Sequence, residues 1–199
     1  MQLFIKMEKQ MYQTIKNLPI DYQFSTKTKE ELKLYGVWFN DNKDIRINHL
    51  IETIKATISF ESWNADFTPS SLKELGRWFY ENLETVKLTE EQYLNKRLQT
   101  PDYIEIDDWD LSIKTRSIIV DIGLYFGEVF IHTHKGLQWK QYFSKIKKDA
   151  DNGHMVIPKF GRLELNPILV TMSVGWGLAR KKDNENRLYD LYKVWEKYL

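Results

Sequence analysis

The chain of 199 residues is 42% hydrophobic and 29% charged, which is ordinary for a globular protein and excludes disorder as its main state. A formal net charge of +1 gives no overall preference for nucleic acid or for a membrane surface. The sequence contains no cysteine, which excludes a disulfide framework, a thiol nucleophile and a thiolate zinc site. Length and composition predict one compact domain, residues 1–199, in a reducing compartment.

The N-terminal segment has no pattern of a secretion signal, because Lys6, Glu8 and Lys9 interrupt its apolar residues. Elsewhere no apolar run approaches the ~20 residues that a membrane-spanning helix needs. We therefore expect a cytoplasmic protein without a membrane partner.

The first half of the chain, residues 1–98, is predicted to be helical and to contain a diverged duplication. The pattern Leu-Lys-x-x-Gly-x-Trp-Phe-x-x-Asn begins at Leu32 and again at Leu72, with six identical positions. Each copy is predicted to form a helix that carries its Leu, Gly and Trp on one side. Trp38 and Trp78 should therefore occupy equivalent positions in the core.

The segments around the two copies also carry helix signals. Apolar residues recur at helical spacing from Ile47 to Ile58, which predicts that helices alternate along this half of the chain. Before the second copy, Thr68 is predicted to be the N-cap of its helix and Pro69 the first helical residue.

Residues 98–116 interrupt the helical pattern and are predicted to be a rigid connection inside the domain, with a short strand. The segment contains Pro101 and alternates apolar and polar residues only briefly. It is also acidic, with carboxylates at Asp102, Glu105, Asp107, Asp108 and Asp110.

A central helix with a continuous apolar face is predicted over residues 117–134. At ~100° per residue, one narrow sector of this helix collects the ionisable side chains of Asp121, Tyr125, Glu128 and His132. Gly123 and Gly127 share one face, which predicts close packing against a neighbouring element. Glu128 would be held by a hydrogen bond to a backbone amide or to Trp139 Nε1, because a buried carboxylate needs partners.

The C-terminal part is predicted to contain a hairpin followed by helices. Residues 137–145 and 155–164 should form a small antiparallel hairpin, whose second segment contains Pro158 and suits a sheet edge or a bend. Asn166 followed by proline predicts the start of a helix. Two helices complete the chain, over residues 168–179 and 187–199. The predicted class is α+β, predominantly helical with a small antiparallel β-hairpin in the C-terminal half.

Part of this layout resembles a known group of proteins. Tyr125-Phe126-Gly127-Glu128 is followed by Trp139 on a strand, by a proline-containing strand and by Asn166-Pro167 at a helix start, within residues 117–180. This order resembles small uncharacterised bacterial proteins, some of which are similar to immunity proteins of contact-dependent and polymorphic toxin systems. The resemblance implies a bacterial, non-enzymatic protein with a toxin domain as its partner, and it identifies no catalytic residue.

The sequence therefore favours a protein-binding module that has no cofactor and no catalytic residue. Trp109 is the candidate anchor of the binding surface, because a large ring in an exposed acidic loop has little structural reason to be there. The alternative is that the Trp109 ring folds back onto the core. Asp107, Asp108 and Asp110 around it would steer the partner. Tyr125 and Glu128 are further candidate binding residues.

Two alternatives remain open. The first is a metal-dependent enzyme in which Glu128 and His132, spaced i, i+4, are joined by His134 and His154 on one ion. The chain lacks an H-E-x-x-H pattern that would support this site. The second is nucleic-acid binding by the basic and aromatic segment 140–148, which could contact phosphates and stack bases.

Overall fold

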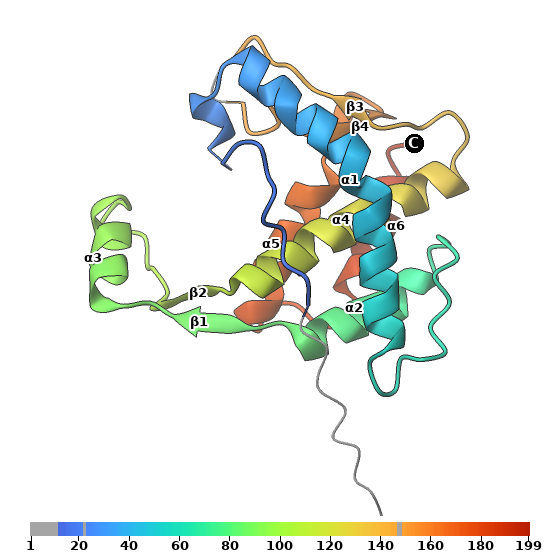
Figure 1. Ribbon diagram of the computed structural model, residues 1–199, viewed down its shortest axis with the longest axis horizontal. Coiled ribbons are helices and arrows are strands. Elements are labelled where there is room, and N and C mark those ends of the chain that lie inside the picture. The colour runs from blue at the N-terminus through green and yellow to red at the C-terminus, as the bar shows by residue number, and fades with distance from the viewer. Residues whose placement is uncertain (1–11, 22, 147–148) are drawn as a thin grey trace, which may run out of the picture.

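The computed structural model describes residues 12–21, 23–146 and 149–199, which form six α-helices, one 3-10 helix and two small antiparallel sheets (Figure 1). The helices are η1 (Phe24–Thr26), α1 (Lys29–Lys55), α2 (Ser71–Asn82), α3 (Glu90–Leu98), α4 (Ile113–Thr133), α5 (Pro167–Ala179) and α6 (Arg187–Glu196). The strands are β1 (Thr85–Lys87), β2 (Trp109–Leu111), β3 (Lys140–Gln141), β4 (Met155–Phe160) and β5 (Leu163–Leu165). The predicted α+β class, mostly helical with a C-terminal antiparallel sheet, is confirmed. None of the described helices is both long and apolar enough to cross a membrane.

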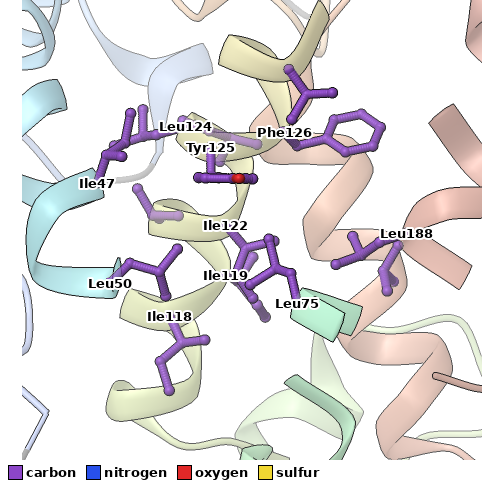
Figure 2. Close-up of a cluster of buried hydrophobic side chains, with 14 of the residues drawn as sticks. Ile47, Leu50, Leu75, Ile118, Ile119, Ile122, Leu124, Tyr125, Phe126 and Leu188 are labelled. Atoms are coloured by element: carbon purple, nitrogen blue, oxygen red, sulfur yellow. The ribbon is translucent and has the colours of Figure 1, made fainter. Parts of the chain in front are cut away.

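Helix α4 lies at the centre of the core. Every residue from Ser117 to Phe130 is buried, so Asp121, Tyr125 and Glu128 of the predicted polar sector lie inside the protein, whereas His132 is exposed. Helix α5 packs along one side of α4, and α1 packs along another. Figure 2 shows side chains from four helices meeting there, among them Leu50, Leu75, Ile118, Ile122 and Leu188.

Two glycines let α4 approach its neighbours closely. A Cβ added at Gly123 would stand 2.8 Å from the Cα of Ile168 on α5, and one added at Gly127 would collide with the Trp139 indole. The predicted close packing at both positions is confirmed. A larger residue at either position would force its neighbour to move.

The two copies of the duplicated pattern have equivalent environments. Trp38 on α1 and Trp78 on α2 are buried, with exposed fractions of 7% and 2%. In each copy the final asparagine donates its amide to the carbonyl of that tryptophan, from Asn42 at 2.8 Å and from Asn82 at 2.9 Å. The prediction that both rings belong to the core is confirmed.

The predicted boundaries around the two copies need correction. Apolar residues from Ile47 to Ile54 belong to the same continuous helix as the first copy, so no separate helix alternates there. Helix α2 begins at Ser71 rather than at Pro69. The Thr68 hydroxyl donates to Asp66 Oδ1 at 2.6 Å, and this local bond replaces the predicted cap.

The C-terminal sheet has the order β3-β4-β5, so its antiparallel pairing is confirmed and a third strand is added. The edge position expected for the segment with Pro158 is wrong, because β4 is the central strand. The register shifts between Ile157 and Phe160, so Pro158 lies where the ladder is interrupted and its missing N–H removes no ladder bond. The predicted helix start is confirmed, because Asn166 Oδ1 accepts the Leu169 N–H at 3.1 Å.

The predicted connection 98–116 contains the expected short strand, β2. Its partner is β1, which lies inside the region that was predicted to be helical, so residues 1–98 are not all helix. Strands β1 and β2 form a ribbon that carries α3 at its outer end, away from the helices of the core (Figure 1). We call residues 85–111 the arm.

Candidate functional site

The ionisable sector of α4 begins with Asp121, which is fully buried. Its carboxylate accepts hydrogen bonds from Arg46 Nε at 2.9 Å and Arg46 Nη2 at 2.5 Å, and from the Tyr12 hydroxyl. Burial raises the pKa of Asp121 to about 6, against the opposing effect of the hydrogen bonds from Arg46 and Tyr12. The group is therefore ionised at neutral pH, and the pair joins α1 to α4.

Tyr125 is the next residue of the sector, and its ring is also fully buried. Its hydroxyl lies 2.8 Å from Ser71 Oγ and accepts the backbone N–H of Phe67 at 3.3 Å. Burial raises the pKa of Tyr125 above its ordinary value, so the phenol stays protonated. The residue connects α4 to the segment before α2, and it is not exposed to a partner.

Glu128 is held as predicted. Trp139 Nε1 donates to Glu128 Oε1 at 2.8 Å, and Lys43 Nζ on α1 donates to the same oxygen at 2.7 Å. His132 Nε2 lies 3.7 Å from Glu128 Oε2, and its ring packs at 4.5 Å from that of Phe67. Two internal donors, Trp139 and Lys43, therefore hold the carboxylate.

The metal-binding alternative is wrong, because the structure does not bring its four residues together. His134 Nε2 lies 3.0 Å from the Tyr192 hydroxyl, on the side of α6, because residues two apart on a helix face different directions. His154 stacks on Phe24 at 4.2 Å, so it meets neither Glu128 nor His132. Across the described ranges, no three His, Asp or Glu side chains are placed to hold one ion.

The basic segment 140–148 contributes to the fold where it is described. Gln141 Nε2 donates to the carbonyls of Leu32 at 2.6 Å and Gly153 at 2.9 Å. Phe143 is half-buried against the core, with Lys29 Nζ 5.1 Å from its ring centre. Lys147 and Lys148 lie outside the described residues, so this alternative stays a prediction.

An open cleft of about 960 Å³ lies between the N-terminal segment and α1. Its polar groups are largely paired with one another. His49 Nε2 accepts the Gln13 N–H at 3.1 Å, and Lys114 Nζ lies 2.6 Å from Glu84 Oε1. Burial lowers the pKa of His49, so the ring is neutral at pH 7. Among the described residues that line this cleft, no acid, base and nucleophile are assembled into one set.

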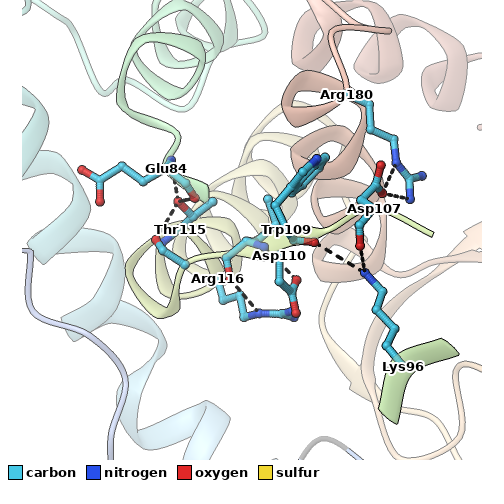
Figure 3. Close-up of polar contacts among 10 residues, drawn as sticks. Glu84, Lys96, Asp107, Trp109, Asp110, Thr115, Arg116 and Arg180 are labelled. Atoms are coloured by element: carbon cyan, nitrogen blue, oxygen red, sulfur yellow. Dashed lines mark hydrogen bonds and ion pairs between the residues drawn. The ribbon is translucent and has the colours of Figure 1, made fainter. Parts of the chain in front are cut away.

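The residues predicted to bind a partner around Trp109 lie at the base of the arm. Trp109 is half-buried against the core, and its ring centre lies 5.5 Å from that of Trp176 on α5, so the structure agrees with the alternative in which the ring folds back. Asp107 pairs with Arg180 at 2.8 Å, and Asp110 pairs with Arg116 at 2.5 Å (Figure 3). These contacts attach the arm to the rest of the protein.

The outer part of the arm has a different character. None of the residues of α3 is buried. The helix and the loop after it expose large apolar side chains: Leu94 (53% exposed), Leu98 (85%), Tyr103 (89%) and Ile104 (43%). In the part of the chain that the structure describes, none of these four side chains packs against the core.

Arg97 holds the loop after α3 in place. Its Nη1 donates to the carbonyl of Ile104 at 2.8 Å, and its Nη2 donates to those of Thr100 at 2.8 Å and Pro101 at 2.5 Å. A guanidinium that bonds three carbonyls fixes the loop without an apolar core. The exposed side chains are therefore presented in one arrangement.

The arm is acidic. Residues 85–111 contain seven Asp and Glu against three Lys and Arg, a net charge of −4 in a chain of net charge +1. Within the described residues, five of these carboxylates have no ion pair: Glu90, Glu91, Asp102, Glu105 and Asp108. The exposed apolar side chains and these carboxylates without ion pairs therefore belong to the same arm.

The sequence interpretation found the acidic character of this region but missed its apolar residues. A local signal was present, because Thr89 and Gln92 form a capping box at the start of α3, with Leu94 and Leu98 spaced i, i+4 behind it. No family model, curated protein or solved structure matches the chain.

Proposed function

We propose that this protein is a non-enzymatic protein-binding module and that the arm, residues 85–111, is its binding element. The observation that carries the proposal is that α3 buries none of its residues while Leu98 and Tyr103 are almost fully exposed. A helix of nine residues is marginal in water without tertiary packing. A helix that also exposes large apolar side chains would be stabilised by a partner that covers them.

The base of the arm supports this role. Trp176 contacts the Trp109 ring, and the Arg180 guanidinium lies 5.2 Å from the centre of the Trp176 ring while bonding Asp107. An element that is fixed before binding loses less conformational entropy in the complex. The arm is therefore suited to rigid recognition.

The charge of the arm indicates the chemistry of the partner. Carboxylates without ion pairs and exposed apolar side chains on one arm complement a basic surface with an apolar depression, where charge speeds association and the buried rings supply affinity. Together with the resemblance to immunity proteins, this favours a toxin domain with a basic binding face as the partner. Bacterial origin and a cytoplasmic location are parts of the same proposal.

The arrangement of α4 supports a binding role over catalysis. Asp121, Tyr125 and Glu128 have internal hydrogen-bond partners, and each connects α4 to another segment. A general acid or base must reach a substrate within hydrogen-bond distance. These three side chains are buried and already engaged.

The test is a calorimetric titration of arm variants with any toxin domain that a gene next to this one encodes. Leu98→Ala combined with Tyr103→Ala should weaken binding by at least ~10-fold, the effect of losing an interface anchor. Ile58→Ala is the matched control, because Ile58 is 79% exposed and lies outside the arm. If no such domain binds, or if the arm variant binds like the control, the proposal is wrong.

A further inference from the structure

The two edges of the β1–β2 ribbon differ in their hydrogen bonding. Thr85 lies opposite Leu111, and Lys87 lies opposite Trp109. The Leu88 N–H donates to the Asp108 carbonyl at 2.8 Å. In an antiparallel ladder, hydrogen-bonded pairs of residues alternate with pairs that are not hydrogen-bonded. The backbone groups of Val86 therefore face β2, while those of Thr85 and Lys87 point away from it.

The outer edge of β2 is covered by side chains. Lys96 Nζ lies 3.5 Å from the Trp109 carbonyl, and Arg116 Nε donates to the Leu111 carbonyl at 3.3 Å (Figure 3). The Leu111 N–H donates to Asp110 Oδ1 at 2.7 Å. Side chains that bond an edge in this way prevent another strand from pairing with it.

The outer edge of β1 has no such cover. All three of its residues are exposed, and Val86 is 49% exposed. In the part of the chain that the structure describes, no hydrogen bond reaches the outward backbone groups of Thr85 or Lys87. An edge with unpaired N–H and C=O groups is a template for strand addition.

We propose that β1 accepts an extended strand from the protein partner, so that the ribbon becomes a three-stranded sheet in the complex. This inference rests on the proposed function and adds the binding mode. The occupant is a strand of a basic partner protein, because the arm has a net charge of −4 and two copies of it would repel each other. Opposite Lys87 that strand would carry an acidic or neutral residue, since like charges across a ladder are unfavourable.

A proline at position 87 tests the edge selectively. The backbone N–H that it removes points away from β2, so the hydrogen bonds between β1 and β2 stay intact. Lys87→Pro should weaken binding of the toxin domain by at least ~10-fold, while Lys87→Thr, which also loses the charge but keeps the N–H, should bind within about threefold of the unchanged protein. Equal binding by both variants would overturn the inference, and an unchanged melting temperature shows that the ribbon is intact.

Amide hydrogen exchange gives a second, independent readout. In the free protein, the amides of Thr85 and Lys87 should exchange without protection, and both should become protected in the complex. Protection already present in the free protein would mean that the edge is covered, and the inference would fail. A dimer of the free protein that Lys87→Pro dissociates would identify a second copy as the occupant instead of a basic partner.

The two proposals fail separately. Loss of binding in the Leu98 and Tyr103 double variant, together with full binding by Lys87→Pro, would leave the arm as the binding element and exclude strand addition. Full binding by both the double variant and Lys87→Pro would reject the arm itself.

Discussion

Arg46 and Asp121 form a buried ion pair that joins α1 to the centre of α4, with two nitrogens of the guanidinium on the two carboxylate oxygens. Removing one partner leaves a buried charge without compensation, which typically destabilises a protein by ~3–5 kcal/mol. We expect this loss for Arg46→Met in denaturant unfolding. The double variant Arg46→Met with Asp121→Leu should recover most of it, and a double variant as unstable as the single one would show that the pair itself stabilises the fold.

The buried tryptophans of the duplicated pattern give a second stability prediction. Trp38→Ala and Trp78→Ala should each lower the free energy of unfolding by ~3–5 kcal/mol, because each removes a large ring from the core. Leu34→Ala, at a residue of α1 that is 51% exposed, is the control and should change it by less than ~0.5 kcal/mol. Losses below ~1 kcal/mol for either tryptophan would contradict its placement in the core.

The sequence predicted what depends on local periodicity. The burial of Trp38 and Trp78 and the bond from Trp139 to Glu128 followed from helical spacing and from the need of a buried carboxylate for a donor. The partners on α1 did not, because Lys43 and Arg46 lie 85 and 75 positions from the carboxylates that they bond. Nothing in a local pattern encodes such pairs.

The candidate site shows the same limit. The acidic neighbours of Trp109 left open whether its ring is an exposed anchor or folds onto the core, and its environment is decided by Trp176 on α5, far along the chain. The pairing of β1 with β2 is equally non-local, and it converts the acidic connection into the base of an arm. Only the capping box of α3 could have been recognised from adjacent residues.

His154 predicts a dependence of stability on pH. Burial beside Phe24 lowers the pKa of His154 to about 4, below its ordinary value of about 6.5. The folded state therefore favours the neutral ring, so its contribution is complete above pH ~6.5 and is lost as the pH falls toward 4. Urea unfolding of the unchanged protein and of His154→Phe should give free energies whose difference changes across this window.

Protonation of Asp121 changes the stability of the protein in the opposite direction over part of the same pH range. Its raised pKa, about 6, means that the folded state binds a proton more readily than the unfolded chain as the pH falls below neutral. Comparison with His154→Phe removes this effect, because both proteins retain Asp121. A difference that stays constant from pH 7 to pH 4 would contradict the role assigned to His154.

The apolar residues of the arm should be dispensable for folding. Leu98→Ala and Tyr103→Ala remove side chains that are 85% and 89% exposed, so each should change the free energy of unfolding by less than ~0.5 kcal/mol. Chemical denaturation measures this. A loss above ~1 kcal/mol would mean that these side chains pack within the protein and are not held available for a partner.

The charge of the arm should control how fast the partner binds. Glu90→Lys combined with Glu91→Lys reverses two unpaired carboxylates at the start of α3 and should slow association by about tenfold at low salt. The effect should shrink as ionic strength rises, because exposed charges are screened. Stopped-flow measurements give the association rates, and Glu30→Lys, at an exposed acidic position at the start of α1, is the control. Equal association rates for the arm variant and this control would contradict the prediction.

The most direct test of the binding role of the arm is amide hydrogen exchange across the whole chain, with and without the toxin domain proposed as its partner. In the free protein, α3 should exchange faster than α4, because its residues are exposed and α4 is buried. On binding, we predict that the largest gain in protection falls within residues 85–111. Protection confined to the cleft beside His49, or to any segment outside the arm, would contradict the account.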